Sequence, residues 1–283
     1  MEKVILGAKV RDTPYFSWRD SIQSKWQIPN ITMAKGETTQ EEVQVIEHSK
    51  INGLFFIKGY LNKSMCSHIA TSIHQTCTLD PLKSVKEEVG SYQPWFHYDP
   101  SRYITGCLPH VDNSISREDQ MNTLTDFEVF GNIHPSKWLD LNILCENKSI
   151  SVSKGAAILR QLQLDIPVLL NSIHLNHTLK CAFLQFQRME CGVRIMPHID
   201  SDVPQVDLIV TACISGSNII RIGNVDVQVQ EGDIYALSGY ARHCVKHEVL
   251  SSPQDRLTVT YRFVSHSDTY RQYLRTKLPT VPL

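Results

Sequence analysis

The sequence predicts an α+β protein in which a helical half is followed by an antiparallel β-structure, either a barrel or a jelly roll. Two observations support this fold class. Amphipathic segments with helical periodicity occur before residue 180, whereas the C-terminal third contains short β-rich segments separated by Gly, Pro, Asn and Asp. Strands that recur about every ten residues are typical of barrels and jelly rolls.

Residues 1–50 form a polar N-terminal extension, which we expect to be partly disordered and to which we assign no chemistry. Within it, the run KGETTQEE at 35–42 is typical of a loop that enters a short helix. The apolar segment GLFFIKGYL at 53–61 predicts a buried strand, and the segment that follows it, up to residue 77, predicts an amphipathic helix. The apolar positions of this helix are Met65, Ile69, Ile73 and Cys77.

Residues 51–180 make up a helical and loop half, in which 83–135 are rich in aromatic and turn-forming residues and 155–173 predict a second helix. Seven β-rich segments follow: CAFLQFQRM, VDLIVTACI, NIIRI, VDVQVQ, DIYALSG, HCVKHEVL and RLTVTYRFV. We therefore assign 181–283 to a β-structured core and expect 51–283 to form one compact domain.

The composition excludes several classes of protein. A chain of 283 residues can bury a large core without disulfide bonds, and its eight scattered cysteines are typical of reduced thiols. The 28 Lys and Arg balance 29 Asp and Glu, so polybasic binding of nucleic acid over the whole surface is excluded. No segment of the sequence predicts a membrane-spanning helix or a secretory signal peptide. We expect an intracellular protein, cytoplasmic or nuclear, with no membrane partner and with an oligomeric state that the sequence does not predict.

Three residues are candidate metal ligands. His198 and Asp200 are two positions apart in MPHID, so an extended backbone turns both side chains to the same side. His247 in HCVKHEVL is the third candidate. Two histidines and one carboxylate on one face of a metal form the facial triad of non-haem Fe(II) oxygenases. Taken alone, a His-x-Asp pair is more often a surface histidine and a turn aspartate.

His243 competes with His247 as the third ligand, because the two lie four positions apart in one predicted strand and face the same side. The spacing favours His247, which lies nine residues before Arg256. Other acids and histidines nearby are more typical of solvated loops and isolated side chains: Asp202, Asp207, His174 and His177.

The strand predicted at 256–263 has two different faces. Alternation places Arg256, Thr258, Thr260 and Arg262 on one face and Leu257, Val259, Tyr261 and Phe263 on the other. Two inward arginines are costly unless an anionic ligand compensates them, and a dicarboxylate cosubstrate fits that need. The turn-like run SSPQD at 251–255 predicts a hairpin that would place His247 opposite Thr258.

The motifs PHID, SGYARHCVKHEV and DRLTVTYRF, in this order, resemble the AlkB-like branch of the Fe(II)/2-oxoglutarate-dependent dioxygenases. The resemblance covers about residues 181–264, with a looser similarity in GLFFIKGYLNKSMC. It implies a double-stranded β-helix (jelly roll) core with N-terminal helices packed on it. It also implies Fe(II) held by His198, Asp200 and His247, with O2 and 2-oxoglutarate as cosubstrates. Arg256 would bind the distal carboxylate of 2-oxoglutarate, and Arg262 would lie near its metal-chelating end.

The sequence departs from the family pattern at three positions. Gln187 and Met189 stand where an Asn and a Tyr that contact 2-oxoglutarate are usual, and Thr258 stands where DNA-repair members often have Asn. Gln187 supplies a similar amide, whereas Met189 cannot donate a hydrogen bond. The cosubstrate pocket is therefore altered, and a different keto acid is an alternative. Arg242 either supports the iron site or is an exposed arginine that packs through its stem.

The resemblance implies substrate-recognition loops in 51–180, where an aromatic cluster is found. Its members are Tyr92, Trp95, Phe96, His97, Tyr98 and Tyr103. These rings suit a single-stranded or flipped base, but they equally suit a peptide, a small metabolite or a satellite core. We expect hydroxylation or oxidative demethylation of a modified nucleobase in DNA or RNA. The alternatives are hydroxylation of a peptide side chain or small metabolite, and a β-helix binding module without catalysis.

Overall fold

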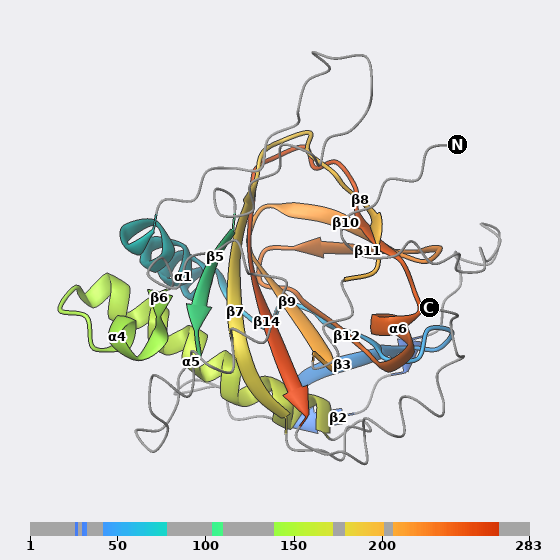
Figure 1. Cartoon of the computed structure of the whole chain (residues 1–283), viewed down its shortest axis with the longest axis horizontal. Coiled ribbons are helices and arrows are strands. Elements are labelled where there is room, and N and C mark those ends of the chain that lie inside the picture. Colours follow the sequence, from blue (N-terminus) through green and yellow to red (C-terminus); the bar gives the residue numbers. More distant parts are fainter. Residues whose placement is uncertain are drawn as a thin grey trace.

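The computed structural model describes residues 26–27, 30–32, 42–77, 104–109, 139–171, 179–200 and 206–265. In this part of the chain two β-sheets lie against each other and helices cover the outer face of the larger one (Figure 1). The α+β class predicted from the sequence is therefore confirmed at the level of a sheet-rich fold with few helices.

The large sheet collects strands from both ends of the chain. Its order is β1 (Trp26–Gln27), β3 (Glu42–His48), β4 (Leu54–Ile57), β12 (Ile234–Ser238), β9 (Leu208–Ser215), β14 (Arg256–Ser265), β7 (Leu179–Met189), β5 (Ile104–Leu108) and β6 (Leu139–Asp140). β2 (Asn30–Thr32) pairs with β3 beside this path. All neighbours are antiparallel except β5 and β6, which are parallel.

The small sheet has the order β11 (Val225–Gln230), β10 (Ser217–Ile222), β13 (His247–Val249) and β8 (Ile195–His198). From β7 to β14 the chain crosses repeatedly between the two sheets, because β7, β9, β12 and β14 belong to the large sheet and the strands between them to the small one. Apolar side chains from both sheets, including Phe56, Met189, Ile222 and Val249, share one buried core. The candidate site lies at this interface.

Four helices occur in the described residues: α1 (Lys63–Thr76), α4 (Leu141–Cys145), α5 (Ile150–Asn171) and α6 (Gly239–His243). Asn62 caps α1, since its Oδ1 atom accepts the Met65 amide at 2.9 Å. α1 and α5 pack closely because Gly155 lies against α1: a Cβ atom there would come within 2.4 Å of the His68 carbonyl oxygen. None of these helices is long and apolar enough to cross a membrane.

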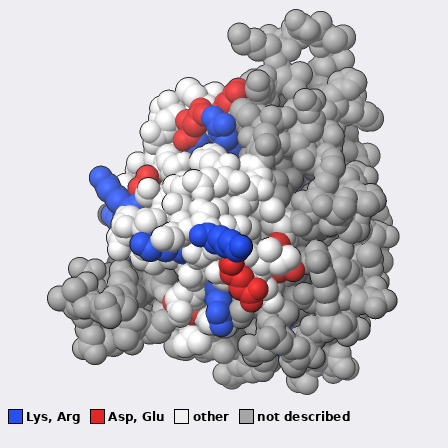
Figure 2. Space-filling view, turned by 90° about the vertical axis from the view of Figure 1, so that its left-hand side faces the viewer, with Lys and Arg blue, Asp and Glu red and all other residues white. Residues whose placement is uncertain are grey.

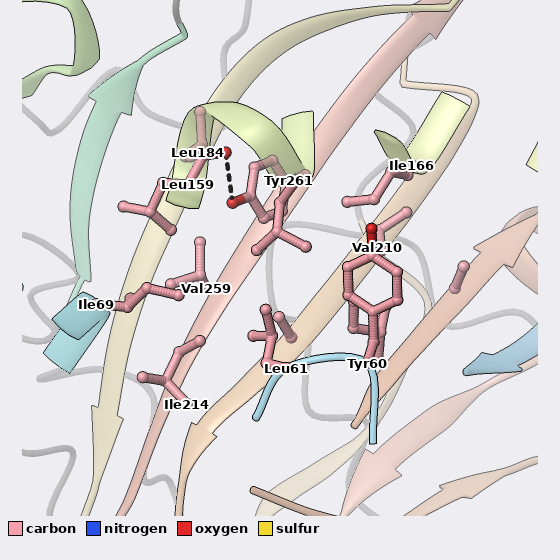
Figure 3. Close-up of a cluster of buried hydrophobic side chains, with 14 of the residues drawn as sticks. Tyr60, Leu61, Ile69, Leu159, Ile166, Leu184, Val210, Ile214, Val259 and Tyr261 are labelled. Carbon is pink, nitrogen blue, oxygen red and sulfur yellow. Dashed lines mark hydrogen bonds between the residues drawn. The ribbon is translucent and has the colours of Figure 1, made fainter. Parts of the chain in front are cut away.

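Helices α1, α4 and α5 cover the outer face of the large sheet, whereas α6 packs against the core between the two sheets (Figure 1). The apolar side of β14, which includes Leu257, Val259 and Tyr261, packs into this core. Tyr261 is fully buried, and its hydroxyl donates a hydrogen bond of 3.1 Å to the Leu159 carbonyl of α5 (Figure 3). The apolar face of β14 thus anchors the helices, while its polar face is turned toward the small sheet.

Several local predictions differ from the structure. Glu42 was expected to enter a short helix, but it begins strand β3, while 35–41 lie outside the described residues. His243 ends helix α6 and does not share a strand with His247. This helix begins directly after β12, where the Gly53 turn approaches so closely that a Cβ on Gly53 would lie 2.1 Å from the Ser238 carbonyl oxygen.

The hairpin predicted around 251–255 is wrong. β13 pairs with β10 and β8, so both of its hydrogen-bonding edges are occupied, and the chain crosses to the large sheet before β14. His247 therefore lies opposite His198 and Ile222. Thr258 lies opposite Gln187 and Cys213 in the other sheet.

Candidate metal centre

Three side chains that could bind a metal converge between the sheets. One ligand atom each from His198, Asp200 and His247 lies within 4.8 Å of the other two. This is the only group of three or more such residues in the part of the chain that the structure describes. His247 lies 47 positions after Asp200 in the sequence, yet the pairing of β13 with β8 places His247 directly across from His198.

The two imidazoles lie next to each other, with ring centroids 4.3 Å apart and planes inclined by 52°. Nδ1 of His198 is 2.7 Å from the Met196 carbonyl, which can only accept, so Nδ1 carries a proton, and in the neutral ring Nε2 keeps its lone pair. A backbone partner of this kind fixes the tautomer and orientation of a metal-binding histidine. His198 is therefore arranged to bind through Nε2.

The carboxylate of Asp200 uses its two oxygens differently. Its Oδ1 atom is 3.3 Å from Nε2 of His198 and 3.8 Å from Nε2 of His247. Ligands at right angles, each about 2.1 Å from a metal, would lie about 3 Å apart, so these separations suit one shared ion. Oδ2 accepts from Nη1 of Arg262 at 3.3 Å. The arginine thus leaves Oδ1 as the atom that is available for a metal.

The charges of the site shift the pKa values of its members. Burial would raise the pKa of Asp200, but Arg262 and the two histidines hold it well below its usual range. Burial opposes the charged form of His198, yet the hydrogen bond and charge of Asp200 outweigh it and raise the pKa of His198. Burial, followed by the nearby His198, lowers the pKa of His247 to about 3. His247 is therefore neutral at physiological pH and Asp200 is ionised, as metal binding requires.

Arg262 is held on three sides. Besides Asp200, its Nη2 atom donates to Oε1 of Gln185 at 3.3 Å, and its guanidinium carbon lies 5.7 Å from the centre of the Phe183 ring. Gln185 was not singled out from the sequence. Its alternation with Gln187 in CAFLQFQRM was the available signal, because both face inward on β7.

Arg256 is in a different situation. It is 3% exposed, and its Nε and Nη2 atoms have no hydrogen-bond partner. Its neighbours on the inner face are Met189, directly opposite on β7, and Cys213 on β9, whose pKa is raised by burial against the opposing effect of the Arg256 charge. Thr258 and Gln187 face each other two positions further along the paired strands. A buried guanidinium with unsatisfied donors, flanked by these polar groups, fits a carboxylate ligand.

A cavity of about 390 Å³ lies at the Arg256 end of β14. Its lining residues are His74, Arg188, Ser215, Asp255, Arg256 and Leu257. None of the three clustered ligand residues, His198, Asp200 and His247, lines this cavity.

Other predicted residues fall elsewhere. His243 and Asp207 are not part of the cluster. Arg242 is 1% exposed, so the interpretation of it as an exposed arginine is wrong, and its Nη1 atom donates to the Asp200 carbonyl at 3.1 Å. The remaining candidates lie outside the described residues: His174, His177, Asp202 and the aromatic cluster Tyr92, Trp95, Phe96, His97, Tyr98 and Tyr103.

No protein-family model matches the sequence, and no curated protein matches it. Solved structures with a similar arrangement include a prolyl-4-hydroxylase of Pseudomonas putida, at 16% identity and a TM-score of 0.40 over 76% of this chain and 94% of that one. A prolyl hydroxylase of Trichoplax adhaerens, in complex with a hypoxia inducible factor peptide, has 11% identity and a TM-score of 0.46 over 79% and 87% of the two chains. A viral collagen prolyl hydroxylase of Paramecium bursaria Chlorella virus-1, solved with 2-oxoglutarate, has 10% identity and a TM-score of 0.44 over 75% and 96%.

Proposed function

We propose that this chain is an Fe(II)- and 2-oxoglutarate-dependent dioxygenase. The observation that carries the proposal is the convergence of His198, Asp200 and His247 around one point, with Arg262 bound to the carboxylate of Asp200. Further along the same strand, Arg256 is buried and leaves its Nε and Nη2 donors without partners. Two histidines and one carboxylate are the ligand set of non-haem Fe(II) oxygenases. A buried cation with free donors is the complement of a dicarboxylate cosubstrate.

The strand order supports the assignment of a double-stranded β-helix. Strands β7 to β14 divide between two four-stranded layers in the orders β12-β9-β14-β7 and β11-β10-β13-β8, which is the alternation of a jelly roll. Helices α1 and α5 pack on the outside of the first layer. Membership of the AlkB-like branch stays a prediction that depends on the motifs SGYARHCVKHEV and DRLTVTYRF.

Each residue has a defined task in this proposal. His198 and His247 bind the iron through Nε2, and Asp200 binds it through Oδ1 while Arg262 holds Oδ2. Arg256 binds the distal carboxylate of 2-oxoglutarate, with Thr258 and Gln187 beside it. When bound, iron and 2-oxoglutarate supply the activation of O2 that oxidises a C–H bond of the substrate. The protein supplies the ligand geometry, the neutralising arginine and a water-poor space between the sheets.

We propose that the substrate is a peptide side chain, and a modified nucleobase is the second candidate. The net charge is −1, and the described part of the helical face carries Lys and Arg interspersed with Asp and Glu, without a continuous basic patch (Figure 2). A long polyanion would gain little from such a surface. The AlkB-like motifs favour the nucleobase as second candidate, in which case hydroxylation of an N-methyl carbon would lead to demethylation.

The test measures metal content and uncoupled turnover of 2-oxoglutarate to succinate and CO2. We expect His198→Ala and Asp200→Ala to lose stoichiometric iron and succinate release. We expect His68→Ala, at a partly exposed histidine of α1 that belongs neither to the cluster nor to the cavity at Arg256, to retain both. Screening hydroxylatable peptides, methylated oligonucleotides and small metabolites for stimulated succinate release then identifies the substrate class. Wild-type protein that binds no iron and releases no CO2 would instead support a binding module without catalysis.

A further inference from the structure

Arg242 is among the largest fully buried side chains in the described residues, with 1% of its surface exposed. An arginine is charged at every physiological pH, so its burial is costly unless specific partners receive its donors. It lies on α6, a five-residue helix between β12 and β13. One group that its guanidinium contacts, the Asp200 carbonyl, belongs to the candidate metal centre.

The Nη1 atom of Arg242 donates a hydrogen bond of 3.1 Å to the backbone carbonyl of Asp200, 42 residues away in sequence. The side-chain carboxylate of Asp200 is bound by Arg262, whose Nη1 atom lies 3.3 Å from Oδ2 of Asp200. One arginine thus fixes the backbone of Asp200 and the other fixes its carboxylate. Together they define where Oδ1 lies relative to the two histidines.

The backbone that carries Arg242 is held by hydrogen bonds to a neighbouring turn. The amide of Ala241 donates to the Asn52 carbonyl at 3.0 Å, and the amide of Ser238 donates to the Gly53 carbonyl at 2.8 Å. Gly53 has a φ of 83° and sits so close to Ser238 that no side chain fits there. The helix is therefore attached to the turn before β4, and Arg242 extends from a rigid support toward Asp200.

We propose that Arg242 is a positioning residue, which acts through the Asp200 carbonyl to hold the carboxylate ligand in its metal-binding orientation. This inference rests on the proposed function, because it assigns Arg242 a role in the same metal centre. A residue that orients a ligand typically contributes 10–100-fold to metal affinity. A purely structural arginine would change the stability of the fold but leave the affinity of the folded protein unchanged.

The experiment titrates the metal-free full chain with Co(II), which substitutes for Fe(II) in air and reports its ligand geometry through visible absorption bands. Arg242→Met retains a long side chain but removes every hydrogen-bond donor, whereas Arg242→Lys retains the charge and one donor group. Arg188→Met is the control, because Arg188 forms a half-exposed ion pair with Asp255. Titrations are run well below the thermal midpoint of each metal-free variant.

We expect Arg242→Met to weaken Co(II) binding by about 10–100-fold and to alter the absorption bands, Arg242→Lys to recover part of the affinity, and Arg188→Met to bind as the wild type does. If Arg242→Met does not fold, a weakened affinity and altered bands in Arg242→Lys carry the same support. Wild-type affinity and wild-type bands in the folded Arg242 variants would overturn the role of Arg242 alone. Failure of the wild-type chain to bind Co(II) would overturn the metal centre itself.

Discussion

Replacement of Arg256 by methionine should have two opposite effects, one on stability and one on ligand binding. Arg256 is 3% exposed and leaves Nε and Nη2 without partners. Each buried donor without a partner costs about 1–3 kcal/mol, and replacing buried, paired ions by apolar residues of similar volume is often neutral or stabilises a fold by about 1–4 kcal/mol. Met189 and Cys213 on the neighbouring strands provide an apolar surface for the new side chain.

We therefore expect Arg256→Met to raise the free energy of unfolding of the ligand-free protein by about 2 kcal/mol. For a domain of this size such a gain raises Tm by roughly 4–8 °C. The same substitution removes the charge-assisted partner of the distal carboxylate, so the affinity for 2-oxoglutarate should fall by about 2–5 kcal/mol, or roughly 30- to 5,000-fold in Kd.

Thermal unfolding without cosubstrate measures the first effect, and calorimetric titration of the Co(II)-loaded protein with 2-oxoglutarate measures the second. Arg188→Met is the matched control on the adjacent strand. Because the ion pair of Arg188 with Asp255 is half-exposed, this substitution should change stability by less than about 1 kcal/mol. The reasoning would be refuted by an unchanged Kd for 2-oxoglutarate, or by a loss of stability in the ligand-free Arg256→Met protein.

Two further predictions concern the scaffold. Gly53→Ala should destabilise the protein by at least about 1 kcal/mol, because φ of Gly53 is 83° and the new Cβ would lie 2.1 Å from the Ser238 carbonyl oxygen. Urea unfolding measures this loss. Gly59→Ala is the control, because Gly59 also has a positive φ but has open space around it. Burial raises the pKa of Cys66 from 9.0 to about 12. Its thiol therefore ionises first in the unfolded chain, and stability that is intact below pH 9 should fall between pH 9 and 12 by about 1.4 kcal/mol per pH unit. Cys66→Ala should reduce the slope of the free energy of unfolding against pH in this range. An unchanged slope would contradict the raised pKa of Cys66.

Local periodicity was enough to predict much of the scaffold. The apolar spacing from Met65 to Cys77 predicted a helix, and α1 occupies Lys63–Thr76 because that apolar face packs against α5 and the large sheet. The alternation in β14 predicted one polar and one apolar face, and the structure has Val259 in the helix-covered core and Thr258 toward the other sheet. In both cases the signal lies within one element.

Strand pairing could not be predicted in the same way. The turn-like run at 251–255 favours a hairpin by its composition, but β13 already has β8 on one edge and β10 on the other. Competition among distant strands for hydrogen-bonding edges decides such a case, and turn residues do not report it. A hairpin at this turn would place His247 near Thr258, whereas the pairing of β13 with β8 places His247 opposite His198.

The sequence by itself determined which chemistry is available and on which face of each strand it lies: His198 beside Asp200, a later His247, and two inward arginines on one strand. Only the tertiary structure decided how these groups are shared. It commits Arg262 to Asp200 and Gln185, leaves the guanidinium of Arg256 with unsatisfied donors, and buries Arg242 against the Asp200 backbone. The physical reason is that side-chain alternation is a property of a few consecutive residues, whereas the partner of a buried charge depends on which distant strands and helices pack around it.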